Sequence, residues 1–131
     1  MKTENILLID DDEDYLFLTQ KGLERLQISK RISIATNGED ALTFIKDNCI
    51  KDVSENCPTI LFIDSHMPGM NGRDFLEKLQ ALEGVDLKKF QIYIVSSLTD
   101  ERDQEILNNY AIKGVVNKPL SLPKIMAIFG I

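Results

Sequence analysis

Residues 6–12 read Ile-Leu-Leu-Ile-Asp-Asp-Asp, an apolar run that stops abruptly at three acids. Further apolar runs follow at residues 32–35 (Ile-Ser-Ile-Ala), 60–63 (Ile-Leu-Phe-Ile), 92–95 (Ile-Tyr-Ile-Val) and 115–116 (Val-Val). Short runs that are rich in β-branched residues and bounded by polar residues are typical of strands buried on both faces. The sequence therefore predicts five short, buried strands.

The segments between these runs have the spacing of amphipathic helices. After the first run, Leu16, Leu23 and Leu26 fall on one helical face. Side chains that can cap a helix stand at four later helix entrances: Asn37, Asn71, Thr99 and Ser121. Residues 47–57 are polar and irregular, which predicts a long loop before the third strand. Five strands alternating with five helices predict one α/β domain with a doubly wound parallel sheet.

Size and charge narrow the classes of function. The chain has 131 residues, the length of one domain, and a formal net charge of −6. A net negative protein lacks the basic surface that nucleic acids or anionic lipids require. The chain contains no apolar run as long as the ~20 residues of a membrane span and does not open with a signal peptide. We therefore expect a cytoplasmic protein that binds neither nucleic acid nor membrane.

The two cysteines, Cys49 and Cys57, are eight positions apart, and His66 is the only histidine. This set is too small for a structural zinc site, which needs four cysteine or histidine ligands. We expect both cysteines to be free thiols in a reducing compartment.

Polar residues that can bind a metal or a phosphoryl group close most of the apolar runs. They are Asp10-Asp11-Asp12 after the first run, Asp64 after the third, Ser96-Ser97 after the fourth and Asn117-Lys118-Pro119 after the fifth. In open parallel sheets the ligand site lies beyond the carboxyl ends of the strands, so these side chains should meet in one crevice.

Such a set of side chains suits phosphoryl chemistry. Carboxylates that gather in one place repel each other, and a hard divalent cation such as Mg²⁺ removes that repulsion. A lysine and a hydroxyl can bind phosphoryl oxygens, and one carboxylate is left as a nucleophile that would form an aspartyl phosphate. Each residue alone also fits a simpler interpretation, because Asp10 to Asp12 could form a solvated helix cap and Lys118 could be a surface lysine. Compatible chemistry at four strand ends is harder to explain in that way.

Four motifs resemble the receiver domain of two-component response regulators, a CheY-like fold. They are residues 6–12, residues 63–72 (Ile-Asp-Ser-His-Met-Pro-Gly-Met-Asn-Gly), residues 95–97 (Val-Ser-Ser) and Lys118-Pro119. The match is collinear and covers nearly the whole chain, and the Asp-x-x-Met-Pro-x-Met-x-Gly motif is specific. The resemblance implies a flavodoxin-like (β/α)5 sheet with strand order 2-1-3-4-5.

The resemblance also implies a role for each site residue. Asp64 would be the phosphoacceptor, Asp11 and Asp64 would bind Mg²⁺ directly, Asp10 would bind it through a water, and the main-chain carbonyl of His66 would complete the protein ligands. Lys118 would pair with the phosphoryl group and with Asp64, Ser96 would move to the phosphate, and the Lys118-Pro119 peptide would be cis. Gly69 and Gly72 suit a sharp turn into the third helix.

Two positions depart from the family pattern. Ser96 replaces the commoner threonine, which keeps the hydroxyl but loses a methyl group that restricts its rotamer. Val115 stands where the fifth strand usually has an aromatic residue that swings inward on phosphorylation, and valine cannot make that movement. We expect the side chain of His66 to be exposed; a histidine there could instead alter the lifetime of the phosphate.

The function implied is that of a single-domain response regulator, residues 1–131, without an output domain and without enzymatic activity of its own. It would accept phosphate from a histidine kinase or phosphotransfer protein. It would then signal to a protein target through the surface of the fourth helix, fifth strand and fifth helix, or relay the phosphate. One alternative is a small haloacid-dehalogenase-type phosphatase with Asp10 as nucleophile, although Glu13-Asp14 replaces the Gly-Thr expected after Asp12. Another is a receiver that binds its partner without phosphorylation.

Overall fold

The computed structural model of the chain describes residues 4–50, 53–97 and 101–131. The strands are β1 (Glu4–Ile9), β2 (Ser29–Ala35), β3 (Ile60–Asp64), β4 (Gln91–Ser96) and β5 (Gly114–Asn117). The helices are α1 (Glu13–Leu26), α2 (Gly38–Cys49), α3 (Gly72–Ala81), α4 (Glu101–Asn109) and α5 (Leu122–Phe129), with a short 3-10 helix at Leu87–Lys89. The alternation of strands and helices predicted from the sequence is confirmed.

The five strands form one parallel sheet in the order β2-β1-β3-β4-β5. This order confirms the flavodoxin-like topology. β3 lies at the centre of the sheet and all five of its residues are buried, which explains why its sequence is apolar up to the final aspartate. The order of the strands reverses between β1 and β3, so the crevice expected at such a switch point opens beside Asp10 and Asp64.

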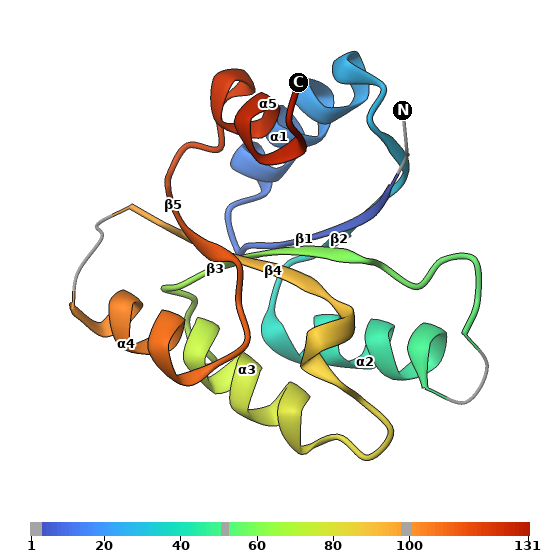
Figure 1. Cartoon of the computed structure of the whole chain (residues 1–131), viewed down its shortest axis with the longest axis vertical. Coiled ribbons are helices and arrows are strands. Elements are labelled where there is room, and N and C mark those ends of the chain that lie inside the picture. Colours follow the sequence, from blue (N-terminus) through green and yellow to red (C-terminus); the bar gives the residue numbers. More distant parts are fainter. Residues whose placement is uncertain (1–3, 51–52, 98–100) are drawn as a thin grey trace.

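Helices cover both faces of the sheet (Figure 1). α1 and α5 lie on one face, and α2, α3 and α4 lie on the other. Successive residues of a strand point to opposite faces, and β1 shows the result. Leu7 and Ile9 belong to the core cluster on the side of α2 and α3, while Ile6 and Leu8 belong to the cluster on the side of α1 and α5. We call the whole cluster on the side of α1 and α5 the α1–α5 core.

The helix entrances agree in part with the sequence. Asn37 accepts a hydrogen bond from the main-chain N–H of Asp40, and Asn71 forms a reciprocal capping box with Asp74, so both predicted caps are confirmed. Ser121 stands at the N-cap of α5 but its side chain makes no capping hydrogen bond. Pro123, in the first turn of α5, has no main-chain N–H. One fewer donor at this helix end therefore needs a capping acceptor. Thr99 lies outside the described residues.

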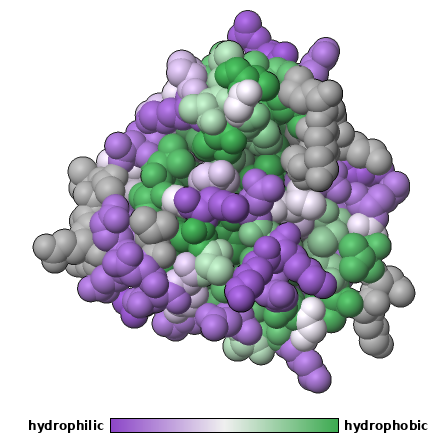
Figure 2. Space-filling model, viewed as in Figure 1, coloured by the Kyte–Doolittle hydropathy of each residue, from purple (hydrophilic) through white to green (hydrophobic). Residues whose placement is uncertain are grey.

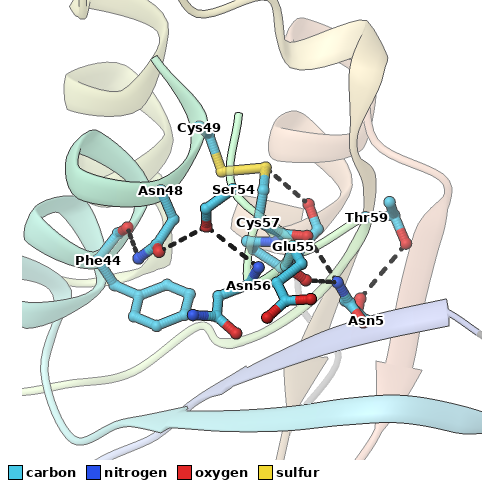
Figure 3. Close-up of a disulfide and its surroundings, with 10 residues drawn as sticks. Asn5, Phe44, Asn48, Cys49, Ser54, Glu55, Asn56, Cys57 and Thr59 are labelled. Carbon is cyan, nitrogen blue, oxygen red and sulfur yellow. Dashed lines mark hydrogen bonds between the residues drawn. A yellow bond between two sulfur atoms is a disulfide. The ribbon is translucent and has the colours of Figure 1, made fainter. Parts of the chain in front are cut away.

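The prediction of two free thiols is wrong, because Cys49 and Cys57 form a disulfide (Figure 3). α2 extends to Cys49, so the loop predicted from residue 47 begins later, and it then folds back on the end of the helix. The main-chain N–H of Ser54 donates to the Asn48 carbonyl at 2.8 Å. The Asn5 side chain donates to the carbonyls of Glu55 and Cys57. These contacts bring the two cysteine Cα atoms to 5.2 Å, within the range that a disulfide spans.

The outer side of α5 is unusually apolar for a surface helix. Ile125 is buried against the sheet, whereas Met126 is 37% exposed and Ile131, just beyond the helix, is 46% exposed. Figure 2 shows hydrophobic residues on the part of the surface where α5 lies. In the part of the chain that the structure describes, no helix combines the length and the apolar character needed to cross a membrane.

Candidate functional site

All five parallel strands end at the same edge of the sheet, and β1, β3, β4 and β5 bring the predicted site residues to it. Asp64 is the last residue of β3 and pairs in register with Val95 of β4. Ser96 follows Val95 and pairs with Asn117, the last residue of β5. Because parallel strands align their carboxyl ends, residues far apart in the sequence come together here.

Three carboxylates gather at this edge. Asp10, Asp11 and Asp64 each offer an oxygen, and these oxygens all lie within 4.8 Å of one another. Asp10 and Asp64 are 2% and 5% exposed, whereas Asp11 is exposed to solvent. A hard cation that prefers oxygen ligands fits this donor set, and the exposed Asp11 leaves the cluster open on one side.

Both oxygens of Asp10 already have partners. Oδ1 accepts a hydrogen bond of 2.9 Å from the main-chain N–H of Asp12, and Oδ2 forms an ion pair of 2.8 Å with Lys118 Nζ. Asp12 is the N-cap of α1 and accepts from the N–H of Tyr15. Asp10 is therefore held by the turn that starts α1 and by the lysine opposite.

Lys118 reaches into the cluster from the loop between β5 and α5. Its Nζ lies 3.9 Å from Asp64 Oδ2, so Asp10 is the nearer partner. The main-chain N–H of Lys118 donates to the Ser96 carbonyl at 2.7 Å. Lys124 of α5 donates to the carbonyls of Asn117 and Pro119, on either side of Lys118. The Lys118-Pro119 peptide is cis, as predicted.

Two glycines allow the chain to turn sharply after Asp64. A Cβ at Gly72 would lie 3.2 Å from the Asp64 carbonyl oxygen and 3.2 Å from the Ser65 Cα, so a side chain there would crowd the backbone next to the site. Gly69 has a φ of +81°, a conformation that residues with a Cβ rarely adopt. Both observations agree with the turn predicted for this motif.

The family model for the response regulator receiver domain matches residues 6–129 of the chain. The chain belongs to this family. A crystal structure of a two-component response regulator from Cytophaga hutchinsonii is 26% identical, with a TM-score of 0.86 and coverage of 99% of this chain and 96% of that one.

Two curated relatives are much longer than the matched region. The two-component response regulator ARR14 of Arabidopsis thaliana is 36% identical over 78 residues, which is 60% of this chain and 18% of ARR14. The autoinducer 1 sensor kinase/phosphatase LuxN of Vibrio harveyi is 26% identical over 129 residues, 98% of this chain and 13% of LuxN. These matches do not favour the alternative of a haloacid-dehalogenase-type phosphatase.

The electrostatics of the receiver site centre on Asp64. Burial and the nearby Asp10 carboxylate raise the pKa of Asp64 from 3.8 to about 6, although the N–H of His66 and the charge of Lys118 act against them. Burial tends to lower the pKa of Lys118, but the carboxylates of Asp10 and Asp64 outweigh burial and its pKa lies above the usual value. Asp64 is therefore ionised at neutral pH, at the cost of repulsion by a second carboxylate.

The remaining predicted residues of the receiver lie around this centre. The side chain of His66 is exposed, as expected, and its main-chain N–H donates to Asp64 Oδ1 at 3.2 Å. Ser96 is fully buried at the end of β4. Val115 is half-buried against the core on the side of α2, α3 and α4. The structure thus brings Asp10, Asp11, Asp64 and Lys118 into direct proximity, with His66 and Ser96 beside them.

Sequence reasoning missed Tyr15, whose ring lies against Lys118 with its centroid 4.3 Å from Nζ. In the sequence Tyr15 looks like one more residue of an amphipathic helix, three positions after Asp12. Only its place in the first turn of α1, next to the acids, could have drawn attention to it.

Proposed function

We propose that this receiver domain accepts a phosphoryl group on Asp64 and acts as the phosphorylated switch of a two-component pathway. The observation that carries the proposal is the meeting of three carboxylates within 4.8 Å, with Lys118 between Asp10 and Asp64. The donor would be a sensor histidine kinase or a histidine phosphotransfer protein. The role is that of a signalling protein rather than an enzyme acting on a substrate of its own.

We assign Mg²⁺ to the acidic cluster. Asp11 and Asp64 would bind it directly, with the main-chain carbonyl of His66, and Asp10 would act through a water. The outer role of Asp10 is supported by its hydrogen bond from Asp12 and its ion pair with Lys118, which occupy both of its oxygens. Bound Mg²⁺ would supply positive charge to the carboxylates and to the phosphoryl oxygens.

In the proposed reaction a carboxylate oxygen of Asp64 attacks the phosphorus. The new bond joins that oxygen to phosphorus, and the bond between phosphorus and the donor nitrogen breaks, with its electron pair staying on the nitrogen. A pKa of about 6 leaves Asp64 mainly ionised at pH 7, in the nucleophilic form. Lys118 lies 3.9 Å from Asp64, close enough to meet a phosphoryl oxygen after a small movement. The Ser96 hydroxyl would donate to another oxygen.

The phosphoryl group would bias an equilibrium between two conformations, because Lys118 and Ser96 contact it only in the modified state. The change would reach a protein target through the surface of α4, β5 and α5, or the phosphate would pass to another carrier. The exposed Met126 on α5 supports a protein-binding role for this surface. Val115 has no aromatic ring, so the inward movement of a ring cannot carry the change at this position. We propose no nucleic-acid or membrane partner.

The test is incubation with phosphoramidate and Mg²⁺, followed by intact mass. We expect one added phosphoryl group that is stable in acid and lost in base. Asp64→Asn should abolish it, Asp10→Asn should only slow its formation, and chelation of Mg²⁺ should prevent it. Phosphate on Asp10 with Asp64→Asn still active would instead support the phosphatase alternative.

A cytoplasmic location is part of the proposal, but the disulfide between Cys49 and Cys57 argues against it, and the state of these cysteines in the cell tests it. Reducing compartments keep thiols reduced, whereas disulfides persist in oxidising ones. Thiols should be trapped with an alkylating agent at the moment of cell lysis, and the mass of the chain measured. Two alkylated cysteines agree with the proposed location; an intact bond between Cys49 and Cys57 would contradict it.

A further inference from the structure

Lys118 has an aromatic neighbour besides the two carboxylates. The distance of 4.3 Å from its Nζ to the centroid of the Tyr15 ring is within the range of a cation–π interaction. The ammonium group is therefore bounded by Asp10 at 2.8 Å, by Asp64 at 3.9 Å and by an aromatic face. The proposed function assigns no role to this face.

Tyr15 is itself held in place from several directions. Its main-chain N–H donates to Asp12 Oδ1 at 3.1 Å, in the N-terminal turn of α1. Its ring packs, half-buried, against the α1–α5 core. Burial raises the pKa of Tyr15 above 10.0, while hydrogen bonds with the Thr19 side chain and the Leu120 main chain act in the opposite direction. Leu120 lies two residues beyond Lys118, so Tyr15 contacts both the lysine and the loop that carries it.

We propose that Tyr15 is a positioning residue that keeps the Lys118 ammonium between Asp10 and Asp64. The inference rests on the proposed function, in which Lys118 meets the phosphoryl group on Asp64. A lysine has a flexible four-carbon stem, and binding a phosphoryl oxygen restricts it. A ring that already confines the ammonium reduces the freedom lost at that moment. Without the ring, the flexible stem of Lys118 would be free to carry the ammonium away from Asp64 and toward solvent.

The same helix offers a matched control. Lys21 lies over the ring of Phe17 at 5.4 Å, and Phe17 is 59% exposed. This second lysine–aromatic pair is two residues from Tyr15 in the sequence, but Phe17 contributes nothing to the acidic cluster. Phe17→Leu therefore removes an aromatic ring from α1 without touching Lys118.

The contact can be measured without any phosphorylation. A lysine over a ring has its ε-methylene protons shifted upfield in the NMR spectrum, and Lys118→Arg assigns the signal. We expect this shift in the wild-type chain and in Tyr15→Phe, and its loss in Tyr15→Leu. A wild-type Lys118 signal at the same position as those of the exposed lysines would overturn the inference.

The effect on the reaction is measured as the rate of phosphorylation by phosphoramidate with saturating Mg²⁺. We expect Tyr15→Leu to react about 2- to 30-fold more slowly, the range of a cation–π interaction. Tyr15→Phe should react at nearly the wild-type rate, and Phe17→Leu should react at the wild-type rate. In a chain that already carries Lys118→Met, adding Tyr15→Leu should not lower the rate further. Urea unfolding checks that each variant is folded, and Tyr15→Met replaces Tyr15→Leu if that variant does not fold.

Three results would overturn the positioning role: a wild-type rate for Tyr15→Leu, equally slow Tyr15→Leu and Tyr15→Phe, or a loss in Tyr15→Leu that persists in the Lys118→Met background. A wild-type chain that takes up no phosphoryl group would overturn the proposed function and, with it, the role in transfer. The NMR shift would still decide whether the ring and the lysine meet, so the two failures can be told apart.

Discussion

Replacing Asp64 by asparagine should stabilise the metal-free protein at neutral pH. The pKa of Asp64 lies near 6 in the folded chain, mainly because the side chain is buried and faces Asp10. In the unfolded chain the group has an ordinary pKa near 3.8. Between these two values the folded state binds more protons than the unfolded state, so this group makes stability fall as the pH rises from about 4 to about 6.

The size of this stability change follows from the difference between the pKa of Asp64 in the folded chain and in the unfolded chain. At about 1.4 kcal/mol for each pH unit, ionising Asp64 removes about 3 kcal/mol of folding free energy at pH 7. Asparagine has nearly the same shape and no charge, and its Oδ1 can still accept the hydrogen bond that His66 donates to Asp64. At pH 7 without Mg²⁺ we therefore expect Asp64→Asn to unfold with a free energy up to about 3 kcal/mol larger than that of the wild type.

The assay is urea unfolding followed by circular dichroism at pH 4 and pH 7, in the presence of a chelator. The gain of Asp64→Asn should disappear at pH 4, where the wild-type carboxyl is largely protonated in the folded chain. Asp14→Asn is the control: this exposed acid lies in the first turn of α1, so its removal should lower stability by only about 0.3–1 kcal/mol. Equal stabilities of Asp64→Asn and wild type at pH 7 would refute the argument that burial and Asp10 make this carboxylate unfavourable.

Three other features should respond to substitution, each measured by urea unfolding. Exchanging both Cys49 and Cys57 for serine opens a loop of eight residues and should lower stability by about 2.5 kcal/mol; dithiothreitol should do the same to the wild type and nothing to the variant. Phe75 is fully buried between α3 and the sheet, so Phe75→Ala should lower stability by about 3–5 kcal/mol, and a loss below 1 kcal/mol would show that the core collapses around the cavity. Asn71→Ala removes one half of the capping box at α3 and should lower stability by about 1 kcal/mol, with Asn71→Ser as the variant that retains the cap.

The outline of the site could be predicted because strand ends are visible in a sequence. An apolar run that stops at a polar residue marks the end of a buried strand, and parallel strands align such ends. Asp10, Asp64 and Lys118 were predicted to meet for this reason, and they do. Their distances were not predictable: Lys118 was expected to pair with Asp64, yet it lies nearer to Asp10. Which carboxylate lies nearer to Lys118 depends on the turn before α1 and on the loop after β5, which Lys124 holds.

The two cysteines show where sequence reasoning fails. Nothing in their spacing distinguishes a bonded pair from two free thiols, because the distance between Cys49 and Cys57 is set by the path of the loop. That path depends on Asn48, Ser54 and Asn5, of which Asn5 belongs to a distant part of the sequence (Figure 3).

The amino-acid sequence by itself determined the number and order of the strands and helices, the two apolar faces of the sheet and the edge where the acids collect. These properties follow from the local alternation of apolar and polar residues, which each segment carries on its own. The tertiary structure alone decided that Cys49 bonds Cys57, that Lys118 lies closer to Asp10 than to Asp64, and that the ring of Tyr15 faces the lysine. Such contacts join residues from different elements, and a difference of one or two ångströms in packing is enough to make or break them.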